Sequence, residues 1–275
     1  MRKESRPIGI FDSGYGGLTI LEHIRKQLPD YDYIYLGDNA RTPYGSRSFE
    51  IVYQFTLQAV KYLFDEKCPL IILACNTASA KALRTIQQVD LPALNPMNRV
   101  LGVIHPTIEA VVAFSHSRHI GILGTTGTIE SKSYNLEIEK IDRDITVTGE
   151  ACPMWVSLVE NNEYANDGAD YFVKKNLANL FASDPQIDTV VLGCTHYPLL
   201  EEKIRKYLPG NITLVSQGPL VADRLSDYLV RHSDMANRLS KNGECRFLTT
   251  EATGKFSETA SLFLNHSVQV ERVVL

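Results

Sequence analysis

Several features of other protein classes are missing from this chain of 275 residues. It has no excess of positive charge, because the formal net charge is −4, so it offers no basic surface for nucleic acid. No stretch approaches the roughly 20 apolar residues of a membrane-spanning helix. The charged amino terminus, residues 1–7, leads into a strand-like segment without the apolar core of a signal peptide. We therefore expect a cytoplasmic protein that binds neither nucleic acid nor a membrane.

Cysteine is scarce, and the sequence has no metal-binding or nucleotide-binding motif. The five cysteines are an odd number and too few for a disulfide-stapled secreted domain, so we expect reduced thiols. No Cys-x-x-Cys or His-x-x-x-His pair occurs, which disfavours a metal site. The dinucleotide fingerprint and the Walker pattern are also missing. These absences predict a protein that works without a metal or another cofactor.

Apolar strand-like runs alternate with amphipathic helical patterns from one end of the chain to the other. This order is typical of an α/β fold with mostly parallel sheets. The predicted strands are 8–12, 33–36, 70–74, 100–104, 119–123, 145–148, 189–193, 212–215, 246–249 and 272–275. The predicted helices are 17–28, 48–66, 78–88, 106–115, 131–139, 168–182, 198–207, 219–229 and 257–264.

Two segments rich in turn formers divide the pattern. Residues 90–98 predict a crossover between two halves, and residues 209–218 predict the return. We expect two similar α/β domains with helices flanking each sheet and the active site in the cleft between them. The first domain is discontinuous, formed by residues 1–97 and 213–275, and the second is formed by residues 98–212.

Two cysteines stand in matching contexts, one in each predicted domain. The apolar run 70–74 ends at Cys75, and the run 190–193 ends at Cys194. Each run predicts a buried parallel strand, so each thiol lies at a strand's carboxyl end, where open α/β sheets bind ligands. A helix predicted after each thiol favours the thiolate. Two thiols facing one carbon from opposite sides would remove a proton from one face and return another to the opposite face.

Each candidate residue also has a structural interpretation. A cysteine after an apolar run is commonly a packed core residue, the reading we favour for Cys68, Cys152 and Cys245. Asp12 or Ser13, in a glycine-rich turn after the first strand, either caps a helix or contacts a substrate. The polar segment 38–45 is either a turn or a wall of a binding site. His196 is a structural histidine whose ring nitrogens make hydrogen bonds within the fold, a metal ligand or a proton partner of Cys194.

Taken together, these segments closely resemble the glutamate racemases of the cofactor-independent aspartate/glutamate racemase family, which supply D-glutamate for peptidoglycan. The resemblance covers nearly the whole chain. It rests on motifs in the expected order: Phe11-Asp12-Ser13-Gly14 with Gly16-Gly17-Leu18, Asp38-Asn39-Ala40-Arg41 with Pro43-Tyr44-Gly45, Cys75-Asn76-Thr77-Ala78, Gly102-Val103-Ile104, Gly124-Thr125 with Thr128-Ile129, and Gly193-Cys194-Thr195-His196-Tyr197-Pro198.

The resemblance implies an isomerase that interconverts L- and D-glutamate. It implies Cys75 and Cys194 as the acid/base pair, Asp12 as the group assisting Cys75, and His196 as the group assisting Cys194. Glu160 corresponds to an acidic residue near the second thiol. The implied substrate-binding residues are Asp12, Ser13, Tyr44, Gly45, Asn76, Thr77, Thr125, Thr128, Thr195 and His196. We further expect a homodimer.

Three positions depart from the family's pattern. Thr107 stands where glycine is expected, Ser157 stands where proline is usual, and Ser216-Gln217-Gly218 lacks an aspartate that is common there. We expect these positions to be peripheral and to affect loop shape and regulation. Two alternatives to a glutamate racemase stay open. One is a racemase of the same design acting on aspartate or a hydantoin, and the other is a non-enzymatic sensor of a small ligand.

Overall fold

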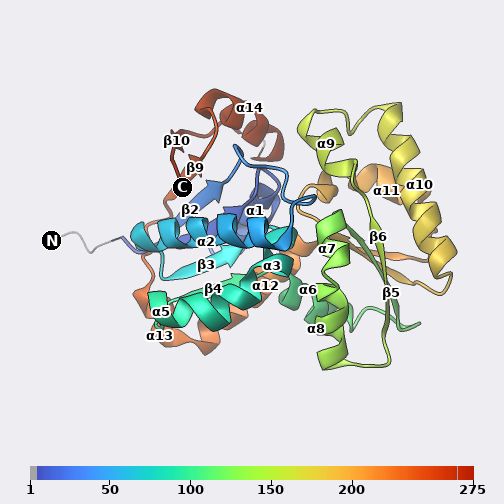
Figure 1. The fold of residues 1–275 in the computed structure, drawn as a ribbon, viewed down its shortest axis with the longest axis horizontal. Coiled ribbons are helices and arrows are strands. Elements are labelled where there is room, and N and C mark those ends of the chain that lie inside the picture. The colour runs from blue at the N-terminus through green and yellow to red at the C-terminus, as the bar shows by residue number, and fades with distance from the viewer. Residues whose placement is uncertain (1–4, 265) are drawn as a thin grey trace.

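A computed structural model describes residues 5–264 and 266–275 and shows an α/β fold with two parallel sheets (Figure 1). The first sheet has the strand order β10-β9-β2-β1-β3-β4. Its strands are β1 (Ile8–Asp12), β2 (Tyr33–Gly37), β3 (Leu70–Leu73), β4 (Arg99–Gly102), β9 (Cys245–Thr249) and β10 (Val270–Arg272). The second sheet has the order β6-β5-β7-β8. Its strands are β5 (His119–Gly124), β6 (Thr146–Ala151), β7 (Thr189–Gly193) and β8 (Thr213–Val215).

Helices flank both sheets, as the alternating pattern predicts. Those that precede β5 are α1 (Gly17–Gln27), α2 (Phe49–Asp65), α3 (Asn76–Lys81), α4 (Leu83–Thr85), the π-helix η1 (Ile86–Asp90), α5 (Leu91–Leu94) and α6 (Ile104–Val111). Between β5 and β8 lie α7 (Thr126–Glu130), α8 (Ser133–Ile141), α9 (Trp155–Glu160), α10 (Asp167–Ser183), the 3-10 helix η2 (Tyr197–Leu200) and α11 (Glu201–Tyr207). The last are α12 (Gln217–Arg231), α13 (Ser233–Arg238) and α14 (Thr253–Leu264).

The central strands are buried on both faces. Every residue of β1, β2, β3 and β7 is buried, which explains why these strands read as unbroken apolar runs. The edge strand β6 instead has no buried residue and carries alternating polar side chains. The two sheets lie side by side in Figure 1, with the carboxyl-terminal end of the chain in the half that holds the first sheet. The α/β fold with parallel sheets is therefore confirmed.

The crossover between the sheets lies later in the chain than residues 90–98. This segment is largely helical, because η1 and α5 extend the helical path to Leu94. Pro92 lies in the first turn of α5, where a missing backbone N–H leaves no helical hydrogen bond unmade. Strand β4 then pairs with β3 in the first sheet. The chain therefore crosses after β4. Of the turn formers in this segment, Pro92 lies in a helix, whereas Asn95 and Pro96 lie in the turn between α5 and β4.

The strands at both predicted domain boundaries belong to the opposite half from the one expected. Residues 98–212 were expected to form the second domain, but β4 pairs with β3 in the first sheet. Residues 213–275 were assigned to the first domain, but β8 pairs with β7 in the second sheet. The two sheets thus exchange β4 and β8 relative to the predicted division, and each keeps the predicted number of strands. The division into two independently folding domains itself stays a prediction.

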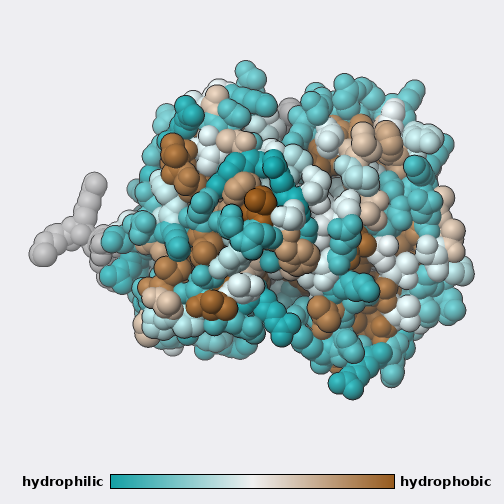
Figure 2. All heavy atoms as spheres, in the orientation of Figure 1, coloured by the Kyte–Doolittle hydropathy of each residue, from teal (hydrophilic) through white to brown (hydrophobic). Residues whose placement is uncertain are grey.

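Smaller differences from prediction affect short elements. Helices α9 and α13 were not predicted, and β10 lies two residues before the expected 272–275 strand. In the described part of the chain, no helix is both long and apolar enough to span a bilayer. Figure 2 agrees with this on the face that it shows, where the hydrophobic areas are small and separated by hydrophilic side chains.

Candidate active site

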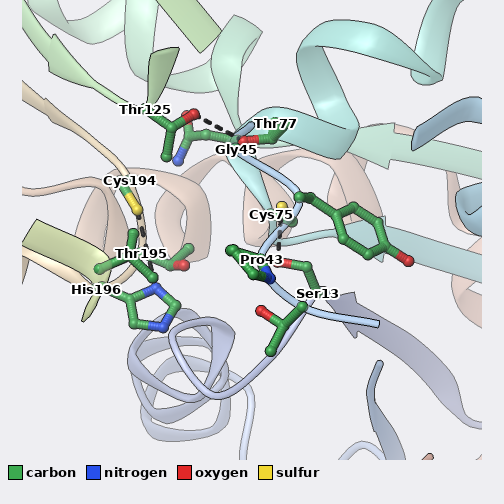
Figure 3. A pocket seen from close by; sticks show the side chains of 13 residues that line it. Ser13, Pro43, Gly45, Cys75, Thr77, Thr125, Cys194, Thr195 and His196 are labelled. Carbon is green, nitrogen blue, oxygen red and sulfur yellow. Dashed lines mark hydrogen bonds between the residues drawn. The ribbon is translucent and has the colours of Figure 1, made fainter. Parts of the chain in front are cut away.

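A pocket lies between the two sheets, at the carboxyl ends of β1, β3, β5 and β7 (Figure 3). Its free volume is about 20 Å³, which is room for one water molecule. The lining residues come from both halves and carry thiols, hydroxyls and amides: Ser13, Thr42, Pro43, Tyr44, Gly45, Cys75, Asn76, Thr77, Thr125, Val156, Cys194, Thr195 and His196.

Cys75 is held at the junction between β3 and α3. It is the N-cap residue of α3, and its sulfur accepts a hydrogen bond from the backbone N–H of Ala78 at 3.4 Å. Its thiol donates to Ser13 Oγ at 3.4 Å. Burial raises the pKa of Cys75 to about 12, and the nearby charge of Asp12 adds to this shift. At neutral pH, Cys75 therefore carries its proton.

Cys194 faces Cys75 from the other side of the pocket and has a different partner. Its Sγ lies 3.9 Å from Nδ1 of His196. The other ring nitrogen of His196, Nε2, lies 3.0 Å from Oε1 of Glu160. Burial alone would lower the pKa of His196, but its contacts with Cys194 and Glu160 outweigh burial and raise the pKa from 6.5 to about 10. His196 is therefore an imidazolium that can donate to both neighbours.

Asp12 contacts the Cys194 side of the pocket as well as its own turn. Its Oδ2 accepts from the backbone N–H of Gly14 at 3.0 Å, and its Oδ1 accepts from Thr195 Oγ1 at 3.4 Å. Full burial raises the pKa of Asp12, whereas the charge of His196 lowers it. The direct hydrogen-bond partner of Cys75 is Ser13 rather than Asp12. Asp12 acts on Cys75 through its charge, so the role that the resemblance implies for it stays a prediction.

A cluster of three threonine hydroxyls joins the halves at the rim of the pocket. The hydroxyl oxygen of Thr77, on α3, lies 3.0 Å from Oγ1 of Thr125 and 3.4 Å from Oγ1 of Thr128. Both of these residues are at the start of α7. A backbone hydrogen bond from Gly127 N to Gly45 O, 2.7 Å long, closes the same gap. Thr128 itself lies behind the lining residues and contacts the pocket through this cluster.

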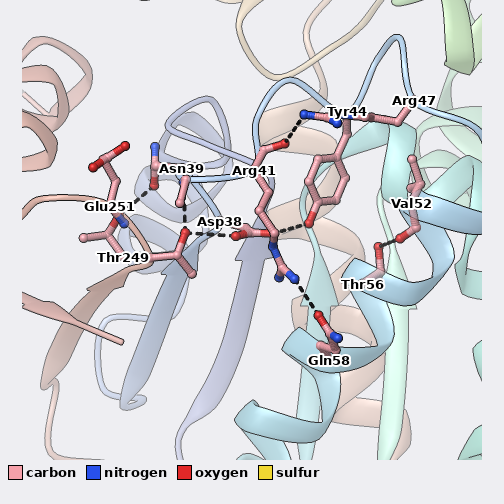
Figure 4. A network of polar contacts seen from close by, with 12 residues as sticks. Asp38, Asn39, Arg41, Tyr44, Arg47, Val52, Thr56, Gln58, Thr249 and Glu251 are labelled. Carbon is pink, nitrogen blue, oxygen red and sulfur yellow. Dashed lines mark hydrogen bonds and ion pairs between the residues drawn. The ribbon is translucent and has the colours of Figure 1, made fainter. Parts of the chain in front are cut away.

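The hydroxyl of Tyr44 makes a hydrogen bond within the protein. It donates to Asp38 Oδ2, which also accepts from Nε of Arg41 at 2.6 Å (Figure 4). The other carboxylate oxygen of Asp38 accepts from Thr250 Oγ1 at 2.9 Å. This network anchors the loop that places Pro43, Tyr44 and Gly45 on the pocket wall. The predicted role of Tyr44 in substrate binding is therefore left to its ring and backbone.

Two of the expected peripheral positions lie directly behind the pocket. Gln217 accepts a 2.5 Å hydrogen bond from Nδ2 of Asn76, and it donates to Thr107 Oγ1 at 2.9 Å. Both Gln217 and Thr107 are buried. The expectation that these positions are peripheral is wrong for these two residues, because Gln217 contacts the pocket residue Asn76 and Thr107 contacts Gln217. Ser157, by contrast, is exposed.

Gly16 is a site residue whose role the sequence does not reveal. It is the N-cap residue of α1, and a Cβ there would lie 2.3 Å from Thr195 Oγ1 and 2.5 Å from His196 Nδ1. Its φ of −58° suits any residue, so only the close approach of the other half requires glycine. The motif Gly14-Tyr15-Gly16-Gly17 was interpreted as a turn that approaches a ligand.

We expect Gly16→Ala to lower kcat at least tenfold, because the new methyl group must displace Thr195 and the His196 ring by roughly 1 Å. Steady-state kinetics with a thermal melt measure the effect. Gly168→Ala is the matched control, since a Cβ at Gly168 would meet no heavy atom within 4 Å. A Gly16→Ala variant with the kinetics of the Gly168→Ala variant would contradict this prediction.

The donors in the pocket are thiols, hydroxyls, amides and one imidazolium. Among residues 5–264 and 266–275, no three His, Cys, Asp or Glu side chains are grouped as ligands for a metal ion. The arrangement provides two proton-transfer groups on opposite sides of one small space. Hydroxyl and amide donors surround that space and can hold carboxylate groups.

This chain is similar to known proteins in sequence and in fold. Residues 17–224 match the model of the family described as Asp/Glu/Hydantoin racemase. The chain is 40% identical to a glutamate racemase of Shouchella clausii over 262 residues, which cover 95% of this chain and 91% of that protein. The crystal structure of a glutamate racemase isoform from Bacillus anthracis superposes with a TM-score of 0.89 at 37% identity, covering 99% of each chain.

A second solved structure, that of the glutamate racemase from Francisella tularensis in complex with D-glutamate, matches with a TM-score of 0.87. It is 34% identical, and the match covers 99% of this chain and 98% of that one. The family match extends over most of the chain, and the similarity in sequence and in fold extends over nearly all of it. This chain therefore belongs to the Asp/Glu/Hydantoin racemase family.

Proposed function

We propose that this protein is a glutamate racemase that interconverts L- and D-glutamate by proton transfer between two cysteines. The observation that carries the proposal is the placement of Cys75 and Cys194 on opposite sides of one pocket (Figure 3). A racemase without a cofactor needs an acid and a base on the two faces of the α-carbon. The identity to glutamate racemases over nearly the whole chain supports glutamate as the substrate.

The reaction begins with the two thiols in different states. In one direction, Cys194 acts as the thiolate, stabilised by the adjacent imidazolium of His196, and its sulfur takes the α-proton of the bound amino acid. The electron pair of the broken C–H bond delocalises into the α-carboxylate. Cys75, which carries its proton, donates it to the opposite face of the planar carbon. In the other direction, the roles are reversed.

The surrounding donors stabilise the carbanion as its charge moves onto the carboxylate. Ser13, Thr77 and Thr195 line the pocket and present hydroxyl groups. The amide of Asn76 also lines the pocket and is assigned to binding a carboxylate of the substrate. Donors held in place before the reaction stabilise developing charge without the cost of reorganising solvent. Glu160 keeps His196 protonated through its hydrogen bond to Nε2. This assignment gives Cys75, Cys194, His196 and Glu160 distinct tasks.

The experiment that tests this proposal follows purified protein with L- or D-glutamate in D₂O, using circular dichroism and proton NMR. We expect both enantiomers to reach the same racemic mixture, and the product to carry deuterium at the α-position, because the donating thiol exchanges with solvent. Aspartate and a hydantoin are tested in parallel and should react at least 100-fold more slowly. Faster turnover of either would make the protein a different racemase, and no exchange at all would favour a ligand sensor.

A supply of D-glutamate for peptidoglycan, a cytoplasmic location and a homodimer complete the proposal. Each follows from the resemblance to glutamate racemases. A strain in which this gene is depleted should lose wall integrity, and external D-glutamate should restore it. Survival without D-glutamate in a strain that has no other source would contradict the cell-wall role.

A further inference from the structure

A closed ring of three hydrogen bonds lies behind the pocket. Tyr134 donates its O–H to Oδ1 of Asn76 at 2.8 Å, Asn76 donates from Nδ2 to Oε1 of Gln217 at 2.5 Å, and Gln217 donates from Nε2 to Oη of Tyr134 at 3.0 Å. All three residues are at most 3% exposed. They come from α8, α3 and α12, so the ring connects elements that flank the two sheets.

The direction of the ring is set by Thr107, which is buried on α6. The hydroxyl of Thr107 donates to the backbone carbonyl of Val103 at 2.6 Å. Its proton is therefore committed, and its oxygen is an acceptor for Nε2 of Gln217 at 2.9 Å. Because the nitrogen of Gln217 must face Thr107, its oxygen must face Asn76. The amide nitrogen of Asn76 then faces Gln217, and its oxygen faces Tyr134.

The ring leaves one proton of Asn76 for the pocket. Nδ2 carries two N–H bonds, and among the described residues only Gln217 accepts from it. Asn76 directly follows Cys75 and lines the pocket. We propose that Thr107 and Gln217 are positioning residues, which hold the Asn76 amide so that its second N–H points to a carboxylate of the substrate. This inference rests on the proposed function, because it takes the ligand to be a dicarboxylic amino acid.

The proposal gives a role to two of the positions that depart from the family's pattern. Thr107 and Gln217 are far apart in the sequence, but both side chains are buried and a hydrogen bond joins them. An amide at position 217 without a hydroxyl at position 107 would form the ring but lose the contact from Thr107 that sets its direction. Together they orient the amide of Asn76 in one sense only, because the reversed ring would place the carbonyl oxygen of Gln217 against Thr107 and Val103.

The test uses Thr107→Val, which keeps the shape of the side chain and removes the acceptor for Gln217. We expect KM for glutamate to rise about five- to tenfold while kcat changes less than twofold, since a hydrogen bond to a substrate carboxylate is made in both the ground state and the transition state. Thr107→Ser keeps the hydroxyl and should restore the KM of the unmodified protein.

The matched control is Thr56→Val. Thr56 is equally buried, and its hydroxyl donates to the carbonyl four residues earlier, Val52 O, at 2.7 Å, as that of Thr107 does. It lies on α2, away from the ring. Thr56→Val therefore removes the same kind of helix contact without touching Gln217, and its KM should be unchanged. An equal rise in KM for Thr56→Val and Thr107→Val would overturn the proposal.

A double-mutant cycle with Gln217→Met decides whether Thr107 acts through Gln217. We expect Gln217→Met to raise KM at least as much as Thr107→Val, and the double variant to show no further increase. Additive effects, or an unchanged KM in Thr107→Val, would reject the proposal. If Gln217→Met does not fold in a thermal melt, the three threonine variants alone decide. Racemisation of glutamate by the unmodified protein is measured first, so a failure of the proposed function is seen separately.

Discussion

Serine in place of Cys75, or in place of Cys194, abolishes racemisation from either enantiomer. A hydroxyl is far less acidic than a thiol, so it neither forms the anion that removes an α-proton nor matches the acidity needed to return one. We expect kcat to fall at least about 1,000-fold in each variant, toward the upper part of the range for loss of one acid/base group. Circular dichroism with pure L- or D-glutamate measures this loss.

The two variants should differ in proton exchange. Each keeps one thiol, and that thiol can still remove and return the proton on its own face of the α-carbon. In D₂O, Cys75→Ser should therefore exchange the α-proton of one enantiomer only, and Cys194→Ser that of the other. Cys245→Ser is the control, because Cys245 is a half-buried thiol on β9 that does not line the pocket. Full racemase activity in either Cys75→Ser or Cys194→Ser would contradict the two-thiol mechanism.

The second large effect is expected for His196→Asn, with kcat lowered about 100-fold or more. The change removes the imidazolium that lies between Cys194 and Glu160. It should slow the direction in which Cys194 acts as the base more than the reverse direction. Initial rates at saturating L- and D-glutamate, measured separately at one pH, give the ratio of the two kcat values, since the two kcat/KM values of a racemase must stay equal. Equal losses in both directions would assign His196 a role other than assisting Cys194.

Glu160→Gln is the pH probe for the same pair. The hydrogen bonds to Cys194 and Glu160 raise the pKa of His196 to about 10, against the opposing effect of burial. Loss of the Glu160 charge lowers this pKa, so the basic limb of the pH–rate profile should move to lower pH. Because the folded state favours the imidazolium, the pair stabilises the protein fully below pH 6.5, and that contribution is lost as pH rises toward about 10. In Glu160→Gln, this stabilisation of the folded protein should be lost at lower pH.

Elements with strong local patterns could be predicted from the sequence. Strands β1, β3 and β7 are short, branched-chain-rich runs that are buried on both faces, and their carboxyl ends carry Asp12, Cys75 and Cys194. Parallel pairing brings the ends of β1 and β3 to one edge of the first sheet, whereas β7 ends at an edge of the second sheet. The placement of each thiol at the carboxyl end of a strand therefore follows from local pattern, but the facing of the two thiols depends on how the two sheets pack against each other.

Features that depend on particular side-chain partners could not be predicted. The turn-forming Pro92 was interpreted as part of a loop, but it lies in the first turn of a helix. Tyr44 was expected to bind the substrate, but its hydroxyl donates to Asp38, six residues earlier in the chain. Thr107 and Gln217 were considered peripheral, although they meet behind Asn76. In each case, the partner that decides the role is invisible to local periodicity.

The order of strands in the first sheet has a consequence for how this chain folds during synthesis. Strand β2 pairs with β9, so that Tyr33 lies beside Cys245. The ribosome must therefore release most of the chain before this pair can form, whereas all four strands of the second sheet lie between His119 and Val215 and can pair earlier. Until β9 arrives, one side of β2 is an open edge for intermolecular strand pairing. Chains that terminate before residue 245 should therefore aggregate, and chaperones that shield exposed strand edges should act on the first sheet.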